Sequence, residues 1–168
     1  MILQRKTRIL LYPHPQTPCC ARIKIKILKN SWIFKIQTAQ KNELALPKGK
    51  TQERRDFLWQ ATCLECFIFD AHSKHYWEYN FAPNGAFALY AFDSYRQKSD
   101  EPPCKPPLIV LKKIKKQHFI FKIIPQTLPP FDHPHLHFCV VLKNKKGELF
   151  YFAEKHFKEK PDFHFFPR

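Results

Sequence analysis

Apolar residues recur at every second position in many short segments of this chain, and no segment shows a helical repeat. Residues 22–29, for example, place Ile23, Ile25 and Ile27 on one side and basic residues on the other. Such alternation is typical of half-buried strands, because successive side chains of a strand point to opposite faces. Fifteen prolines, spread along the chain, further disfavour long helices. The pattern predicts about nine strands, at residues 22–29, 32–37, 58–70, 75–81, 86–92, 108–114, 118–124, 136–143 and 149–153.

Turn signals separate these segments and favour antiparallel hairpins. Residues 82–85 read Ala-Pro-Asn-Gly, in which proline at the second position and glycine at the fourth fit a type I turn. Many short strands without helices are typical of a β-sandwich. A chain of 168 residues is long enough for one domain with a real core and too short for two. We therefore expect a single all-β domain over residues 1–168, an antiparallel β-sandwich with few or no helices.

The composition excludes several other classes of protein. Hydrophobic residues make up 44% of the chain and glycine occurs 3 times, which excludes a disordered or collagen-like chain. No apolar run approaches the roughly 20 residues of a membrane-spanning helix. Residues 1–12 lack the apolar stretch of roughly 7–15 residues that a secretory signal needs. We therefore expect a cytoplasmic protein that neither spans a membrane nor has one as a partner, and that keeps its 6 cysteines reduced.

The chain is strongly basic, with 29 lysine and arginine residues against 14 acidic ones and a formal net charge of +15. Most of these cations are lysines that alternate with apolar residues, which is typical of a solvated sheet face. The alternative is a basic protein that binds nucleic acid or another polyanion through residues 112–116, Lys143, Lys145 and Lys146. Because the lysines are dispersed in the sequence, we expect any polyanion binding to be weak, indifferent to sequence and sensitive to salt.

The middle of the chain carries several motifs in a fixed order. They are Leu58-Trp59, Thr62-Cys63-x-Glu65, Glu78-x-Asn80, Pro83-x-Gly85 and Asp93-x-Tyr95-Arg96. In this order they resemble the bacterial DOMON-like proteins, whose sandwich is similar to that of the family-nine carbohydrate-binding modules. Residues 13–18 and 160–164 resemble the two ends of the same family, so the resemblance covers nearly the whole chain. It implies a β-sandwich of the sugar- or haem-binding kind, usually without known catalysis.

Two glutamates, Glu65 and Glu78, lie within apolar segments, where an unpartnered buried charge costs several kcal/mol. One interpretation is a buried network that fixes the strand register. Its cationic members would be Arg54, Arg55 and Arg96, because a guanidinium can pair with a carboxylate through two hydrogen bonds.

The second interpretation is a carbohydrate site on one sheet face. Polar side chains would bond the sugar hydroxyls, and an aromatic ring would take the apolar C–H face of the sugar. The polar candidates on each strand alternate in sequence and therefore share a face. The candidate ligand-binding residues are Trp59, Glu65, Tyr76, Trp77, Glu78, Asn80 and Arg96.

Glycoside hydrolysis is a further alternative, because paired carboxyl groups supply the acid and the base or nucleophile of that reaction. Glu65 and Glu78 would be that pair. The separation that hydrolysis needs is spatial, so sequence alone does not test it. The resemblance favours a protein that is not an enzyme.

We expect neither a metal nor a cofactor. Cys63 and Cys66 have the spacing of a zinc or redox pair, but strand geometry sends their side chains to opposite faces. His135 and His137 share a face, and we expect them to be exposed at the start of a strand. Met1 is the single methionine, so a methionine-ligated haem is not expected. The chain is also too poor in clustered acids for a calcium site.

Overall fold

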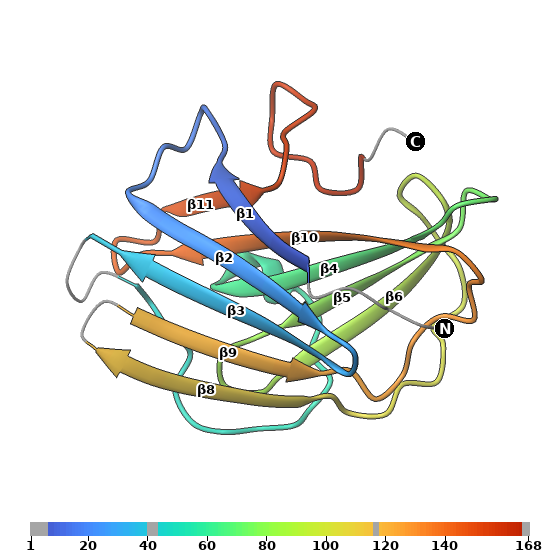
Figure 1. Ribbon diagram of the computed structural model, residues 1–168, viewed down its shortest axis with the longest axis horizontal. Helices are drawn as coiled ribbons and strands as arrows, with labels where there is room; N and C mark the ends of the chain where they lie inside the picture. The colour runs from blue at the N-terminus through green and yellow to red at the C-terminus, as the bar shows by residue number, and fades with distance from the viewer. Residues whose placement is uncertain (1–6, 40–43, 116–117, 166–168) are drawn as a thin grey trace.

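The computed structural model describes residues 7–39, 44–115 and 118–165. In this part of the chain eleven strands form one continuous antiparallel sheet in the order β7-β6-β5-β4-β10-β11-β1-β2-β3-β9-β8 (Figure 1). A 3₁₀ turn at Leu58–Gln60 is the only helix in the described ranges, which therefore hold none that could cross a membrane. The strands are β1 (Thr7–Pro13), β2 (Ala21–Leu28), β3 (Ser31–Thr38), β4 (Cys63–Asp70), β5 (Tyr76–Phe81), β6 (Phe87–Ser94), β7 (Gln97–Lys98), β8 (Leu108–Lys115), β9 (His118–Ile124), β10 (Pro134–Lys143) and β11 (Leu149–Ala153).

Strand β1 divides the sheet into two halves that face each other. Its first part pairs with β2, where Leu11 lies opposite Ile23, and its end pairs with β11, where Tyr12 lies opposite Ala153. We call β1, β2, β3, β9 and β8 sheet A, and β7, β6, β5, β4, β10 and β11 sheet B. Sheet A lies in front of sheet B in Figure 1. The fold is therefore all-β, antiparallel and sandwich-like, as the alternation predicted.

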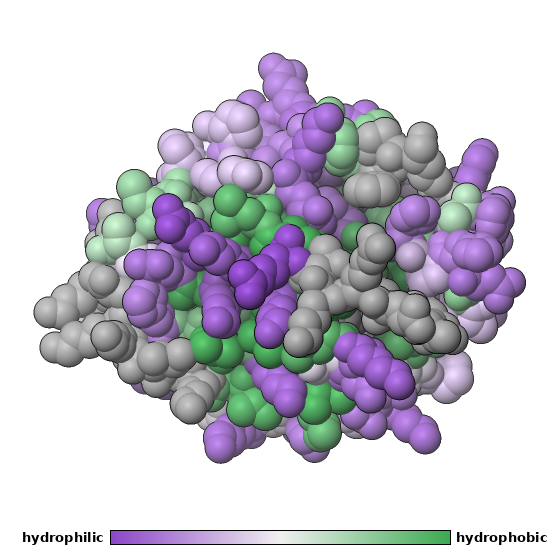
Figure 2. All heavy atoms as spheres, in the orientation of Figure 1, coloured by the Kyte–Doolittle hydropathy of each residue, from purple (hydrophilic) through white to green (hydrophobic). Residues whose placement is uncertain are grey.

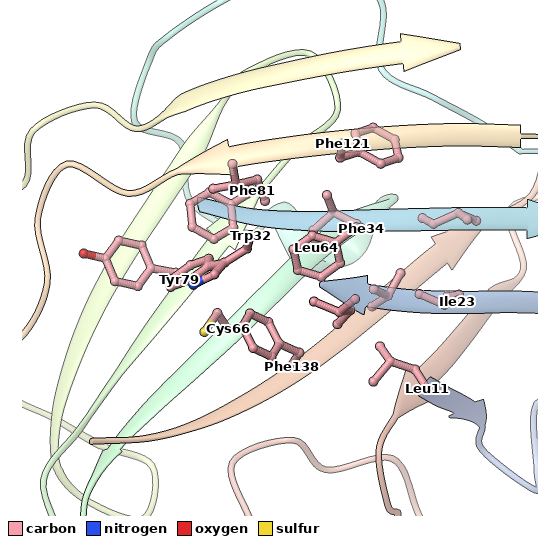
Figure 3. Close-up of a cluster of buried hydrophobic side chains, with 14 of the residues drawn as sticks. Leu11, Ile23, Trp32, Phe34, Leu64, Cys66, Tyr79, Phe81, Phe121 and Phe138 are labelled. Carbon is pink, nitrogen blue, oxygen red and sulfur yellow. The ribbon is translucent and has the colours of Figure 1, made fainter. Parts of the chain in front are cut away.

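The main core fills the space between the two sheets (Figure 3). Trp32 of β3 lies with its ring centroid 5.4 Å from that of Phe138 on β10, and the Phe34 ring lies 5.7 Å from the same phenyl group. Tyr79 and Phe81 of β5 also meet the Trp32 ring edge-on. Edge-on contacts between large rings add to the gain from burying their area, so these rings hold the two sheets together.

A second, smaller core lies on the outer face of sheet B. Its aromatic side chains come from β4, β5 and β6, and Trp59 and Phe163 pack on it from segments outside the sheet. This cover explains why every residue of β4 from Cys63 to Phe69 is buried, because a strand with one wet face buries only alternate residues. The segments before β4 and after β11 therefore enclose this face.

Most of the predicted strands match the observed ones within two residues at each end, but some differ. The strand predicted at residues 58–70 begins only at Cys63, because Phe57 adopts a left-handed backbone (φ 60°) and the 3₁₀ turn follows it. The alternation of polar and apolar residues does not predict β1, because its outward-facing Leu10 is apolar and interrupts that alternation. Strand β7 has two residues, too few to show any period.

The turn between β5 and β6 depends on Gly85. Its N–H donates to the carbonyl of Ala82 at 3.0 Å, which confirms the predicted turn, and its φ is 101°. A side chain at this position would overlap the carbonyl oxygen of Thr51. We therefore expect Gly85→Ala to lower the free energy of unfolding by about 3 kcal/mol or more, from left-handed strain together with the overlap.

Gly147→Ala is the matched control, because Gly147 has a φ of 89° but an added Cβ would meet no atom within 4 Å. Its free energy of unfolding should fall by about 1–2 kcal/mol, the cost of the left-handed backbone alone. Urea unfolding of the two variants measures the difference. Equal losses would contradict the close approach of Thr51 to the turn.

Candidate functional site

A pocket of about 660 Å³ lies on the outer face of sheet B. Two carboxyl groups, those of Glu65 on β4 and Glu78 on β5, lie at its base. Trp59 forms one wall, and residues 161–164 of the segment after β11 form another. The pocket is therefore built from the sheet and from the two segments that cover it.

Strand alternation brings the two glutamates to the same face. Glu65 pairs directly with Asn80 on β5, and Phe67, two residues along β4, pairs with Glu78. The segments before β4 and after β11 cover this face of β4 and β5. Glu65 is therefore 3% exposed and Glu78 is 5% exposed. The site thus holds two carboxyl groups on adjacent strands, largely removed from water.

Glu65 has an unsatisfied polar atom. Its Oε1 is buried and has no hydrogen-bond partner among the described residues. Burial, and then the nearby charge of Glu78, raise the pKa of the Glu65 carboxyl well above its usual range. This environment therefore favours the protonated carboxyl, which can both donate and accept a hydrogen bond.

Both oxygens of the Glu78 carboxyl have a polar neighbour. Asn80 donates its side-chain N–H to Oε1 at 2.7 Å, and Nε2 of His164 lies 3.6 Å from Oε2. Burial raises the pKa of Glu78 to about 7, although the Asn80 hydrogen bond and the charges of Lys98 and Arg96 act in the opposite direction. The Glu78 carboxyl therefore titrates close to neutral pH.

His164 joins Glu78 to Tyr76. The Tyr76 hydroxyl lies 2.9 Å from Nδ1 of His164 and accepts a hydrogen bond from the backbone N–H of Arg96 at 3.0 Å. Burial raises the pKa of Tyr76 to about 12, and burial with the Arg96 charge lowers the pKa of His164 to about 4. At neutral pH the imidazole is therefore neutral, and its Nδ1 shares a hydrogen bond with the Tyr76 hydroxyl while its Nε2 faces Glu78.

The arginines do not pair with these carboxyl groups. Arg96 pairs with Asp162 at 2.9 Å, Arg55 pairs with Glu53 at 2.6 Å, and Arg54 pairs with Asp56 and Glu101. The interpretation of a buried network in which arginines neutralise Glu65 and Glu78 is therefore wrong. Acids outside the strands take these cations instead, and none of them is as deeply buried as Glu65 or Glu78, so pairing there requires less desolvation.

The structure brings together most of the seven candidate residues. Trp59, Glu65, Glu78 and Arg96 line the pocket. Asn80 is fully buried behind Glu78, and Tyr76 borders an adjoining hollow of about 600 Å³. Trp77 does not join them, because its side chain packs on the inner side of sheet B against Phe131.

Several pocket residues lie outside the candidate set, namely Lys98, Asp162 and His164. Lys98 reaches the pocket from the short strand β7, whereas Asp162 and His164 reach it because the chain after β11 folds back over sheet B, which no local pattern encodes. The motif at residues 160–164 was the available signal, since its resemblance to a family end singled out the segment that contains two of them.

The cysteine pair and the histidine pair that were considered as metal ligands can now be placed in the fold. Cys63 faces the outer core of sheet B and Cys66 faces the main core, which confirms that their side chains point to opposite faces. His135 is exposed, but His137 is 2% exposed, so the expectation that both are exposed is wrong. The segment after β11 covers the position of His137, and burial lowers its pKa to about 4. Within the described ranges, no three His, Cys, Asp or Glu side chains come together as metal ligands.

No protein-family model and no curated protein matches this sequence. A solved structure does match the fold, that of a proposed carbohydrate-binding protein from Bacteroides uniformis ATCC 8492. The two chains superpose with a TM-score of 0.59 at 11% sequence identity, over 93% of this chain and 82% of the other. The similarity shows a shared all-β fold across nearly the whole chain.

The raised pKa of Glu78 predicts how stability changes with pH. A carboxyl whose pKa is about 7 when folded and 4.5 when unfolded stabilises the fold fully below pH 4.5 and loses this contribution as the pH rises through 7. Glutamine cannot ionise. The stability of Glu78→Gln relative to the natural protein should therefore rise by about 2–3 kcal/mol between pH 5 and pH 8.

Denaturant unfolding of both proteins across this range measures the difference. Glu53→Gln is the control, because Arg55 lowers the pKa of Glu53 and that exposed group gives no such rise. A constant difference between Glu78→Gln and the natural protein would contradict the buried environment of Glu78.

Proposed function

We propose that the pocket on sheet B binds a neutral carbohydrate and that the protein acts by binding, without catalysis. The observation that carries this proposal is Oε1 of Glu65, a buried polar atom without a hydrogen-bond partner in a residue that lines the pocket. A buried polar group of this kind loses about 1–3 kcal/mol if it stays unpaired. A ligand hydroxyl can satisfy it, since a hydroxyl both donates and accepts.

The walls of the pocket suit the rest of a sugar. The Trp59 ring meets Tyr90 edge-on at 5.9 Å and Phe57 at 5.5 Å, which forms an aromatic side to the pocket. Sugars present apolar C–H groups on one face of the ring and hydroxyls around its edge. An aromatic wall beside two carboxyl groups matches both features.

The charges around the pocket favour a neutral ligand. Arg96 is neutralised by Asp162, and Nζ of Lys98 lies 4.0 Å from the centre of the Tyr90 ring. The cations are thus held by groups of the protein, and burial favours the protonated form of Glu65. An anion therefore finds no unpaired cation among the described residues of the pocket. The fold shared with a proposed carbohydrate-binding protein supports the same ligand class.

Binding to a glycan array of neutral and acidic members tests the proposal, with Trp59→Ala and Trp77→Ala as matched variants. Neutral glycans should be retained, and Trp59→Ala should weaken their binding at least tenfold, because it removes the aromatic wall. Trp77→Ala should keep the binding, since Trp77 lies on the other side of the sheet. Failure to retain any neutral glycan, or equal losses in the two variants, would overturn the proposal.

Incubation of the retained glycan with the protein tests the absence of catalysis. No new reducing end should form. Hydrolysis that is abolished both by Glu65→Gln and by Glu78→Gln would instead assign the two carboxyl groups an acid–base role.

A further inference from the structure

The two sheets carry opposite balances of charge. The strands of sheet A contain nine lysine or arginine residues and no aspartate or glutamate. The strands of sheet B contain two lysines against four acidic residues. The basic excess of the chain is therefore not spread evenly over the fold, although the lysines are dispersed in the sequence.

Strand pairing places like charges directly opposite each other on the outer face of sheet A. Lys24 of β2 pairs with Lys35 of β3, and Arg8 of β1 pairs with Lys26 of β2. Like charges in such pairs repel and destabilise a sheet. None of the ion pairs found among the described residues involves these four cations. The arrangement lowers stability, and an external anion would relieve the repulsion.

These cations surround a hollow of about 620 Å³ that crosses β1, β2, β3 and β9. Figure 2 shows this side of the molecule, where hydrophilic side chains project in front of an apolar surface. Apolar side chains also reach solvent at the margins of sheet A. Leu10 on β1 is 37% exposed, and Leu108 and Val110 on β8 are 45% and 55% exposed. Val110 pairs with Lys122, so the aliphatic groups stand beside the cations.

We propose that the outer face of sheet A docks onto an anionic lipid surface. Headgroup phosphates would enter the hollow and lie between the paired cations, and the marginal aliphatic side chains would reach the acyl boundary. Each lysine or arginine near such a surface adds to the attraction, and inserted aliphatic groups supply the second signal that stable peripheral binding needs.

Nucleic acid is a weaker match to the same face. Binding of single strands relies on aromatic side chains on which bases stack. The aromatic residues of β3 and β9 (Trp32, Phe34, Phe119 and Phe121) are buried in the main core, and Phe119, which also borders the hollow, is only 8% exposed. The outward positions between the cations hold Ile33 and Ile120 instead, which offer no stacking surface.

Cosedimentation with vesicles tests the proposal, using phosphatidylcholine alone and phosphatidylcholine with one third phosphatidylglycerol. The full chain should sediment with the anionic vesicles and remain in solution with the neutral ones. Lys24→Gln/Lys35→Gln should weaken binding at least tenfold and leave the melting temperature equal or higher, because it removes a repulsive pair. Lys145→Gln/Lys146→Gln, with the same change in net charge in the exposed turn after β10, should bind as the natural protein does.

The double variant Leu10→Ser/Val110→Ser tests the contribution of the exposed aliphatic side chains to vesicle binding. It should reduce vesicle binding and should leave the binding of heparin and of oligouridylate unchanged. Two results would overturn the proposal. One is the absence of binding to anionic vesicles. The other is equally tight binding to heparin or oligouridylate with no effect of the aliphatic variant, which would assign the face to a linear polyanion.

Discussion

Replacing Phe138 with alanine should lower the free energy of unfolding by about 3–5 kcal/mol, the range for removing a fully buried phenyl ring. Phe138 is 0% exposed, and its ring meets both Trp32 and Phe34 from the opposite sheet. The substitution leaves a cavity between the sheets that neither side can close without moving a strand. Urea unfolding followed by tryptophan fluorescence measures the loss.

Phe57→Ala is the matched control, because Phe57 is 60% exposed. It should change the stability by about 0.5 kcal/mol or less. A loss at Phe138 no larger than the loss at Phe57 would contradict the packing of sheet A on sheet B.

Asn80→Asp should produce a second large effect, a loss of about 3–5 kcal/mol near pH 8 that becomes smaller in acid. Asn80 is 0% exposed, donates to Oε1 of Glu78 and pairs across the strands with Glu65. Aspartate removes the donor and adds a third carboxyl group to a site that holds no unpaired cation. Protonation at low pH removes the added charge, so the loss should decrease as the pH falls from 8 to 5.

Asn84→Asp makes the same chemical change in the turn between β5 and β6. The side-chain oxygen of Asn84 accepts from the N–H of Ala86 at 3.2 Å, and aspartate can accept there equally well. The expected change in stability is about 0.5 kcal/mol or less. Thermal melting at several pH values compares the two variants. An Asn80→Asp loss that does not depend on pH would contradict the clustering of the carboxyl groups.

The strands could be predicted from sequence because their cause is local. Ile23, Ile25 and Ile27 face one core, so the alternation that marks β2 is also its burial pattern. The same argument fails where both faces are covered. Strand β4 buries seven successive residues, so apolar side chains occupy both of its faces. The polar Glu65 is then the main sign in the sequence of which residues share a face.

The candidate site was predicted in part for the same reason. Glu65, Glu78 and Asn80 share a face because of strand alternation, which sequence reveals. His164 and Asp162 reach the site only because the segment after β11 returns across sheet B, and that return depends on tertiary packing. The gathering of cations on sheet A is likewise a result of strand order. Lys24 and Lys35 are far enough apart in sequence to look dispersed, yet they are direct neighbours in the sheet.

A neutral carbohydrate bound in the pocket on sheet B would contact one of the 3 tryptophans, so their indole N–H signals report such binding. Trp59 lies in the pocket wall, whereas Trp32 is in the main core and Trp77 is on the inner side of β5. Nitrogen–proton spectra of the labelled protein would be recorded during titration with glucose, galactose, N-acetylglucosamine, maltose, cellobiose and the glycans retained on the array. We expect a saturable shift of the Trp59 signal, while the signals of Trp32 and Trp77 do not move. A Trp59 signal that none of these sugars moves, or a shift confined to Trp77, would contradict carbohydrate binding in this pocket.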